Sequence, residues 1–151
     1  MKRRLFLSTS GALAVLAAMP TGAIEPSKVV QLFKSAKCGC CGNWANHMRS
    51  AGFTVQVTEV ADTSAARKRL GMPDRFGSCH TAIVDGYAIE GHVPATEVKR
   101  LLDMKTKAIG LAVPGMPPSA PGMDVRGRSD PYRVLLIDVS GQSSVFASYP
   151  K

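Results

Sequence analysis

Residues 29–48 read VVQLFKSAKCGCCGNWANHM, a stretch that combines the start of a sheet, a cysteine cluster and a helix. Val29–Lys34 is rich in β-branched and apolar residues, which predicts a strand that runs into the cluster. Behind the cluster, Trp44, Met48 and Ala51 recur at the spacing of one apolar helix face. The fold is therefore expected to open with a strand and a helix joined by a short segment that carries cysteines.

The rest of the chain continues this alternation of short elements. The patterns predict a strand over Phe53–Val60, a helix from Asp62 to Leu70, a hairpin of Thr81–Val84 and Tyr87–Gly91 around Asp85-Gly86, a helix beginning at Pro94, an irregular loop over Gly110–Arg128, and a final hairpin of Arg133–Val139 and Ser144–Ala147. A βαβ half followed by a ββα half is the topology of thioredoxin. We therefore expect one α/β (α+β) domain, thioredoxin-like, with a long Pro/Gly/Met loop and a C-terminal β-hairpin.

The cysteines occupy a defined position in that topology. Cys38, Cys40 and Cys41 fall between the first strand and the first helix, where the thioredoxin fold keeps its active site. The amino-terminus of a helix lowers the pKa of nearby thiols. The start of the third strand faces the same point, so Cys79, two residues before Thr81, is expected to reach the other three sulfurs.

The first 23 residues are expected to be a secretory signal peptide, which leaves residues 24–151 as the folded domain. A basic start at residues 2–4 precedes an apolar run over Leu5–Ala18 that is too short to span a membrane, and small residues follow it. The paired arginines also resemble a twin-arginine export signal. The predicted location is periplasmic, and without a second apolar span the cleaved product is expected to be soluble.

An exported protein with four cysteines can use them as disulfides. A bond between the neighbours Cys40 and Cys41 would be strained. The remaining possibilities join Cys38 to Cys41 or to Cys40, and leave the last sulfur for Cys79. A structural disulfide framework is therefore one interpretation of the cluster.

Four segments together resemble a known family: Cys38-Gly39-Cys40-Cys41, Ser78-Cys79-His80-Thr81-Ala82, residues 86–94 (GYAIEGHVP) and residues 110–117 (GLAVPGMP). They are similar to the CopG-type family of exported copper-resistance proteins, and the resemblance runs from about Val29 to the end of the chain. It implies a thioredoxin-like fold and copper binding through the C-x-C-C motif and the later cysteine. It also implies a role in copper handling, with other periplasmic copper-handling proteins as candidate partners.

The residue types favour copper independently. Thiolates are soft ligands that select Cu(I), whereas four-cysteine zinc sites use two separated C-x-x-C units, which this chain lacks. Adjacent Cys40 and Cys41 cannot easily hold one ion together with Cys38, but crowded sulfurs suit bridging. Our hypothesis is a multi-copper Cu(I) thiolate cluster on Cys38, Cys40, Cys41 and Cys79.

The alternative is a thioredoxin-like thiol–disulfide oxidoreductase that could act on copper itself. Cys38 and Cys41 have C-x-x-C spacing at a helix start, and Cys40 or Cys79 could resolve a mixed disulfide. Such enzymes place a cis-proline just before the third strand, where this chain has His80. This difference favours metal binding over catalysis, and enzymatic activity is left open.

Further residues could contribute ligands. His80 is expected either to bind the metal or to hydrogen-bond the backbone at a strand start. Met116 and Met123 could bind Cu(I) through their thioethers, although filling an apolar surface is the favoured role. His92 would lie across a strand from the Cys79 region only if the hairpin register allowed it, and we expect a structural hydrogen bond instead. For His47 we expect a half-exposed surface position.

Composition argues against other function classes. The formal net charge is +8, but the basic residues are scattered and aromatic residues are few, which gives no support for nucleic-acid binding. The chain contains neither a G-x-S-x-G motif nor a glycine-rich phosphate loop with its lysine. Hydrolysis and nucleotide chemistry are therefore not predicted.

Overall fold

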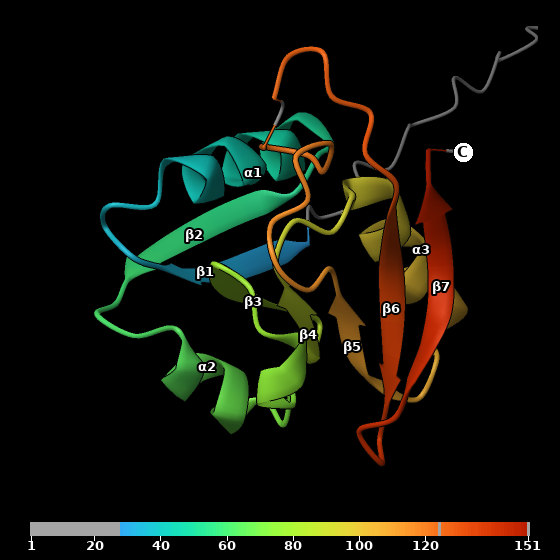
Figure 1. Cartoon of the computed structure of the whole chain (residues 1–151). Coiled ribbons are helices and arrows are strands. Elements are labelled where there is room, and N and C mark those ends of the chain that lie inside the picture. The colour runs from blue at the N-terminus through green and yellow to red at the C-terminus, as the bar shows by residue number, and fades with distance from the viewer. Residues whose placement is uncertain (1–27, 124, 151) are drawn as a thin grey trace, which may run out of the picture.

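The computed structural model describes residues 28–123 and 125–150 as a mixed α/β fold around a seven-stranded sheet (Figure 1). In chain order its elements are β1 (Val29–Lys34), α1 (Gly39–Ser50), β2 (Thr54–Glu59), α2 (Ser64–Arg69), the 3-10 helix η1 (Asp74–Phe76), β3 (His80–Val84), β4 (Tyr87–Glu90), α3 (Ala95–Met104), β5 (Ala108–Ala112), β6 (Tyr132–Asp138) and β7 (Ser143–Tyr149). The proposed signal peptide, residues 1–23, lies outside the described residues. Among those described, no helix is long and apolar enough to cross a membrane.

The strands lie in the order β2-β1-β3-β4-β5-β6-β7. β1 pairs in parallel with β2 and antiparallel with β3, and β3 pairs antiparallel with β4. The β3–β4 turn is Asp85-Gly86, with φ of 50° and 83°. Two successive positive φ values identify the tight hairpin turn that the Asp-Gly pair predicts, and the predicted hairpin is confirmed.

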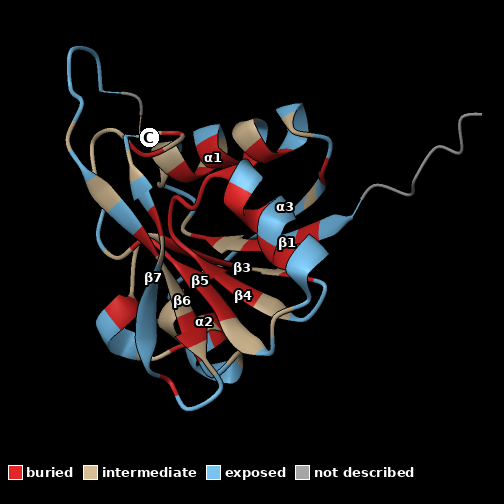
Figure 2. Cartoon of the chain, turned by 90° about the vertical axis from the view of Figure 1, so that its right-hand side faces the viewer, coloured by how far each residue is buried: buried red, intermediate tan, exposed pale blue. Residues whose placement is uncertain are grey.

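Helices cover the two faces of the sheet unequally. α1 and α3 lie over one face, with α2 on the other (Figures 1 and 2). The larger core lies under α1 and α3, and its side chains include Trp44, Met48, Leu101, Leu32 and Ile89. A smaller core on the opposite face comprises Met72, Phe76, Ala88, Ala112 and Ile137. Neighbouring strand residues such as Ala88 and Ile89 enter different cores because side chains alternate across a strand.

The predicted loop over Gly110–Arg128 is wrong at its start. Gly110 to Ala112 belong to β5, which pairs in parallel with β4 and antiparallel with β6. The irregular segment follows β5 and ends at β6. The final hairpin, β6 with β7, is confirmed, since the two strands pair antiparallel over most of their length.

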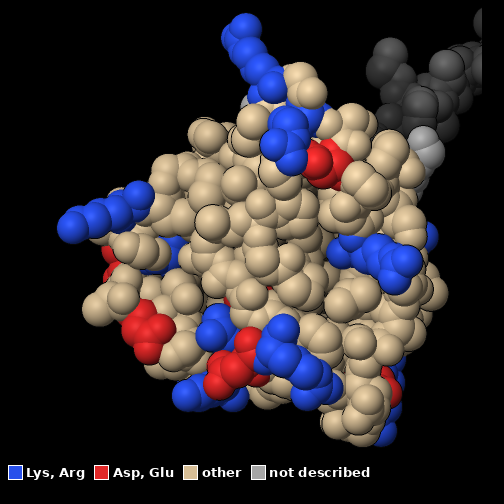
Figure 3. Space-filling view, in the orientation of Figure 1, with Lys and Arg blue, Asp and Glu red and all other residues tan. Residues whose placement is uncertain are grey.

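Charged side chains lie in separate groups on the face seen in Figure 3. Some charged residues of the chain pair with near neighbours in sequence: Lys68 with Asp74 at 3.7 Å and Arg128 with Asp130 at 2.7 Å. Exposed pairs of this kind each contribute between about 0 and 1 kcal/mol to stability. The fold therefore rests mainly on the two apolar cores.

Candidate metal centre

Two neighbouring strands bring the four cysteines together. Cys38 lies at the N-cap of α1, and Cys40 and Cys41 lie in its first turn. Cys79 directly precedes β3, whose first residue, His80, pairs with the last residue of β1. The end of β1 and the start of β3 therefore lie at the same edge, and Cys79 meets the start of α1 there. The four sulfur atoms lie within 4.8 Å of one another.

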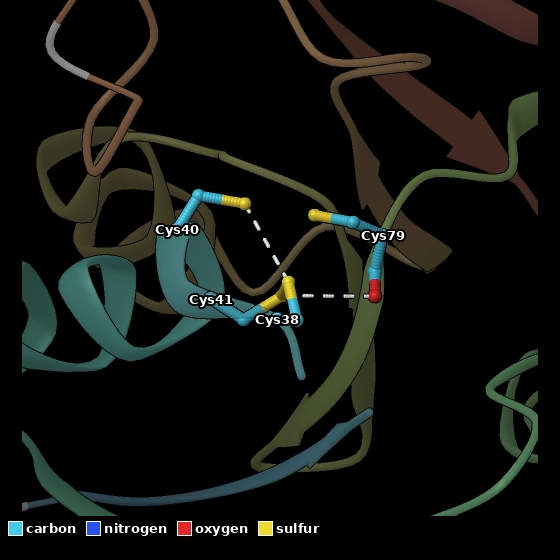
Figure 4. A group of neighbouring side chains, drawn as sticks. All are labelled: Cys38, Cys40, Cys41 and Cys79. Carbon is cyan, nitrogen blue, oxygen red and sulfur yellow. Dashed lines mark hydrogen bonds between the residues drawn. A yellow bond between two sulfur atoms is a disulfide. The ribbon is translucent and has the colours of Figure 1, made fainter. Parts of the chain in front are cut away.

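The sulfurs are in two chemical states, as Figure 4 shows. Cys38 and Cys41 form a disulfide with a Cα–Cα distance of 5.5 Å, which is one of the pairings considered from the sequence. Cys40 and Cys79 are free thiols, so the second bond of that framework is not formed. The Cys40 thiol lies 3.5 Å from the Cys38 sulfur, and the Cys41 sulfur lies 3.7 Å from the Cys79 carbonyl oxygen.

Cys79 also contacts two buried histidines. Its Sγ lies 3.0 Å from His92 Nε2 and 3.4 Å from His80 Nδ1. The Nδ1 of His92 is 2.7 Å from the Pro121 carbonyl oxygen, and a carbonyl can only accept. Nδ1–H must therefore donate, which leaves Nε2 as the acceptor nitrogen that faces the Cys79 thiol.

The prediction for His92 accounts for one of its two ring nitrogens. The structural hydrogen bond exists, but the other ring nitrogen contacts a candidate ligand. The hairpin register, which the sequence analysis left open, decides this second contact. Thr81 pairs with Glu90, and continuing this antiparallel register by two residues sets Cys79 opposite His92.

His80 lies inside the core rather than at the surface. Its side chain is fully buried, and its ring lies 4.5 Å from the Trp44 ring and 5.0 Å from the His92 ring, centroid to centroid. Burial, helped by His92, lowers the pKa of His80 to about 3, so the imidazole is neutral. Its Nε2 atom is buried and has no hydrogen-bond partner among the described residues. A buried neutral imidazole with one nitrogen at Cys79 suits either a ligand or a residue that orients one.

Burial also affects Cys79. Loss of solvent, followed by the charge of Cys40, raises the pKa of Cys79 to about 12. Burial therefore sets the direction of the pKa shift at Cys79, which directly precedes β3 and is not part of α1. Cys79 is therefore a protonated thiol, and a soft metal ion with high affinity for thiolate sulfur can displace its proton.

A buried carboxylate fixes the segment that carries Cys79, and the sequence analysis did not identify it. Glu90 is fully buried and accepts hydrogen bonds from the Ser78 backbone N–H at 2.7 Å and the Thr81 hydroxyl at 2.6 Å. Arg67 pairs with the same carboxylate at 3.2 Å. Burial raises the pKa of Glu90 while these three partners oppose that shift. Ser78 and Thr81 flank Cys79 and His80, so Glu90 holds both sides of the pair.

Close backbone approach depends on Gly91, which separates Glu90 from His92. Its φ is +70°, and a Cβ here would lie 2.6 Å from both the Ser78 hydroxyl and the Val113 carbonyl oxygen. Only glycine therefore lets the Cys79 segment pack against the strand end that leads to His92.

The long loop after β5 passes over the start of α1. Pro121 accepts the hydrogen bond of His92, and a Cβ on Gly122 would lie 2.6 Å from the Trp44 amide nitrogen. Met123 is half-buried beside this contact, whereas Met116 is 53% exposed and does not fill an apolar surface. Of the two methionines, Met123 adjoins the segment that touches α1.

The chain is similar to known proteins in sequence and in fold. Residues 76–123 match a family model described as "Protein of unknown function, DUF411", a range that contains Cys79, His92 and Pro121 but not the C-x-C-C motif. Two solved structures described as "Copper resistance protein copG", form 2 and form 1, are 44% identical to this chain. The matches cover 82% and 84% of this chain and 99% and 100% of the solved chains, each with a TM-score of 0.78. The chain belongs to the CopG family.

Membership of the CopG family confirms the resemblance inferred from the four sequence segments. No curated protein matches the chain significantly.

Proposed function

We propose that this CopG-family protein is a periplasmic copper-binding protein of copper resistance. It holds Cu(I) through Cys38, Cys40, Cys41 and Cys79 once the disulfide is reduced. The observation that carries this proposal is the mutual distance of at most 4.8 Å among the four sulfurs. The description of the solved relatives as copper resistance proteins supports it.

The donor set suits a soft ion. Two sulfurs bound to one metal at about 2.3 Å each are separated by at most about 4.6 Å, close to the largest separation here. The thiols and imidazoles of the two candidate metal-binding groups are donors typical of copper sites, and neither group, among the described residues, contains a carboxylate. Because four sulfurs share such a small volume, each thiolate can bridge two ions, and a multi-copper cluster follows.

The domain is proposed to be thioredoxin-like. Its first half is β1-α1-β2 with parallel strands, and its second half is β3-β4-α3 with antiparallel strands. The cysteine motif lies between β1 and α1, and His80 occupies the start of β3 where a redox enzyme of this topology carries proline. Export rests on the predicted signal peptide at residues 1–23.

An anaerobic titration of the fully reduced protein with Cu(I), in competition with a chromogenic chelator, tests this function. We expect more than one bound ion per chain, and Cys79→Ser should lose most of them. Met104→Leu is the control, because Met104 is 59% exposed at the end of α3. Met123→Leu and Met116→Leu test the thioethers. Saturation at one ion would overturn the cluster, and no retention against the chelator would overturn copper binding.

The Cys38–Cys41 disulfide supports a second candidate, a thiol–disulfide oxidoreductase. The Cys40 sulfur lies 3.5 Å from the Cys38 sulfur, so a Cys40 thiolate could attack the disulfide and release Cys41 as a thiolate. Reduction of insulin by the copper-free dithiol form tests this activity. Turnover that disappears in Cys38→Ser would favour it over simple binding.

A further inference from the structure

We infer that Cys79 and His92 form a thiolate–imidazole subsite that binds one Cu(I) ion even while Cys38 and Cys41 are joined by the disulfide. This inference rests on the proposed copper function and deepens it. It adds a nitrogen ligand to a site otherwise made of sulfur. It also gives the chain two loading states instead of one.

The Cys79 sulfur and one ring nitrogen of His92 are already in contact. Cys79 Sγ and His92 Nε2 are 3.0 Å apart, and the two residues flank one β-hairpin, Cys79 just before β3 and His92 two residues after the end of β4. Bonds of about 2.3 Å to sulfur and 2.0 Å to nitrogen let a single ion join these two atoms after a small side-chain movement. The ion takes the place of the thiol proton in the present hydrogen bond.

The orientation of His92 supports ligation. Its side chain is fully buried, and its Nδ1–H donates to the Pro121 carbonyl oxygen at 2.7 Å. A histidine whose second nitrogen is held by a carbonyl is the usual arrangement of a metal-binding imidazole, because the hydrogen bond fixes both the tautomer and the ring. The lone pair of Nε2 is thereby directed at Cys79.

The subsite does not need the disulfide to open. With Cys38 and Cys41 bonded to each other, Cys40 and Cys79 remain thiols. The Cys79–His92 contact is present in that same state. The Cys79, His80 and His92 donor atoms also lie within 4.8 Å of one another, so the oxidised chain keeps a complete donor group on the hairpin alone.

The binding step is balanced without electron transfer. Cu(I) bonds to Cys79 Sγ and His92 Nε2, the S–H bond breaks, and the proton passes to buffer. The copper stays Cu(I), and the disulfide stays oxidised. The step therefore needs neither an oxidant nor a reductant.

The test uses the protein with its disulfide intact, verified by mass before and after an anaerobic Cu(I) titration against a chromogenic chelator. We expect one ion per chain, and a Cu–N distance near 2 Å by X-ray absorption. His92→Ala should weaken binding at least tenfold and remove the nitrogen signal. His47→Ala is the matched control, because His47 Nε2 accepts a hydrogen bond from Ala95 N–H away from the cysteines and should leave both readouts unchanged.

A second variant covers the case in which His92→Ala fails to fold. Cys38→Ser/Cys41→Ser removes the disulfide and two ligands together, and it should still bind one ion with the same nitrogen signal. The inference is overturned if the reduced wild type binds several ions while the oxidised wild type binds none. It is also overturned if the nitrogen signal persists in a folded His92→Ala. Failure of the reduced wild type to bind any copper would instead refute the proposed function.

Discussion

The Glu90 carboxylate accepts the backbone N–H of Ser78 at 2.7 Å, one residue before a candidate copper ligand. The same carboxylate accepts the Thr81 hydroxyl and pairs with Arg67. A buried charge is tolerated here because three donors surround it. The position of the Cys79 backbone therefore depends on a side chain that does not contact any of the four sulfurs in the described structure.

Replacing Glu90 by alanine should destabilise the protein and weaken copper binding. Removing one partner of a buried pair costs about 3–5 kcal/mol, and we expect the lower end because Arg67 also pairs with Asp74 at 3.1 Å. Urea unfolding of the copper-free protein measures the loss. Glu59→Ala is the control, since Glu59 is 61% exposed and should cost under about 1 kcal/mol. Equal midpoints for the two variants would contradict this role.

Gly122→Ala should separate the long loop from α1. The new Cβ would lie 2.6 Å from the Trp44 amide nitrogen and 2.9 Å from its Cα, both backbone atoms that cannot rotate away. Gly115→Ala is a close control on the same loop, with φ of +70° against +85° but with open space around the Cβ. Conformational strain alone costs each about 1–2 kcal/mol.

The steric clash should therefore lower the free energy of unfolding of Gly122→Ala by about 1–3 kcal/mol more than that of Gly115→Ala. It should also weaken copper binding, because Pro121 would no longer hold His92. Guanidinium unfolding and the chelator titration give the two readouts. Identical behaviour of the two alanine variants would show that the loop contact is not important.

The β6–β7 turn should weaken at acidic pH. Asp138 accepts hydrogen bonds from Ser140 N–H, the Ser140 hydroxyl and Gln142 N–H, and these bonds lower the pKa of Asp138 below its ordinary value of 3.8. A lowered pKa means that the folded state prefers the carboxylate. Its stabilising contribution is therefore complete above the unfolded pKa and is lost as pH falls through the folded pKa.

Asp138→Asn should remove that part of the pH dependence. As the pH is lowered from 6 to 2.5, the midpoint temperature of thermal unfolding should fall less steeply for the variant than for the wild type. The comparison is made on the copper-free protein, so that metal release does not contribute. Parallel curves for the two proteins would refute the assignment.

Copper removal should lower the stability of the reduced protein. A ligand that binds only the folded state at a free concentration of one hundred times its Kd adds about 2.7 kcal/mol to the free energy of unfolding. In buffers of increasing free Cu(I) concentration, the midpoint temperature of thermal unfolding should rise accordingly. Excess chelator should reverse that rise. Cys79→Ser should show a smaller rise, and an equal rise would exclude Cys79 from the site.

Much of the fold follows from local signals. β1 has the predicted bounds because its β-branched residues border a cysteine cluster, and the β3–β4 turn follows from Asp85-Gly86. β5 was missed because Ala and Gly dominate it and its pairing is set by β4 and β6, which lie elsewhere in the chain. Met104 follows Leu101 at helical spacing, which is typical of a core position, but α3 ends there and leaves Met104 59% exposed.

The residues of the candidate site also divide into those that the sequence predicts and those that it does not. The four cysteines could be predicted as metal ligands because closely spaced thiols are chemically distinctive. Their proximity could be predicted because the expected topology places the start of β3 beside the start of α1. Glu90 could not be predicted as part of the site, because its partners come from two separate segments, α2 and residues 78–81, and a strand-end glutamate is ordinarily exposed. His92 required the hairpin register to be applied beyond the end of β4.

The Asp85-Gly86 turn controls this arrangement from a distance. Cys79 lies six residues before the turn, roughly 20 Å away at about 3.3 Å per strand residue. One inserted residue at the turn would shift the register by one and direct alternate side chains to the wrong face. The contact between Cys79 and His92 would then be lost although neither residue had been substituted. The number of residues in a solvent-exposed turn must therefore be kept for the proposed copper ligands at the opposite end of the hairpin to meet.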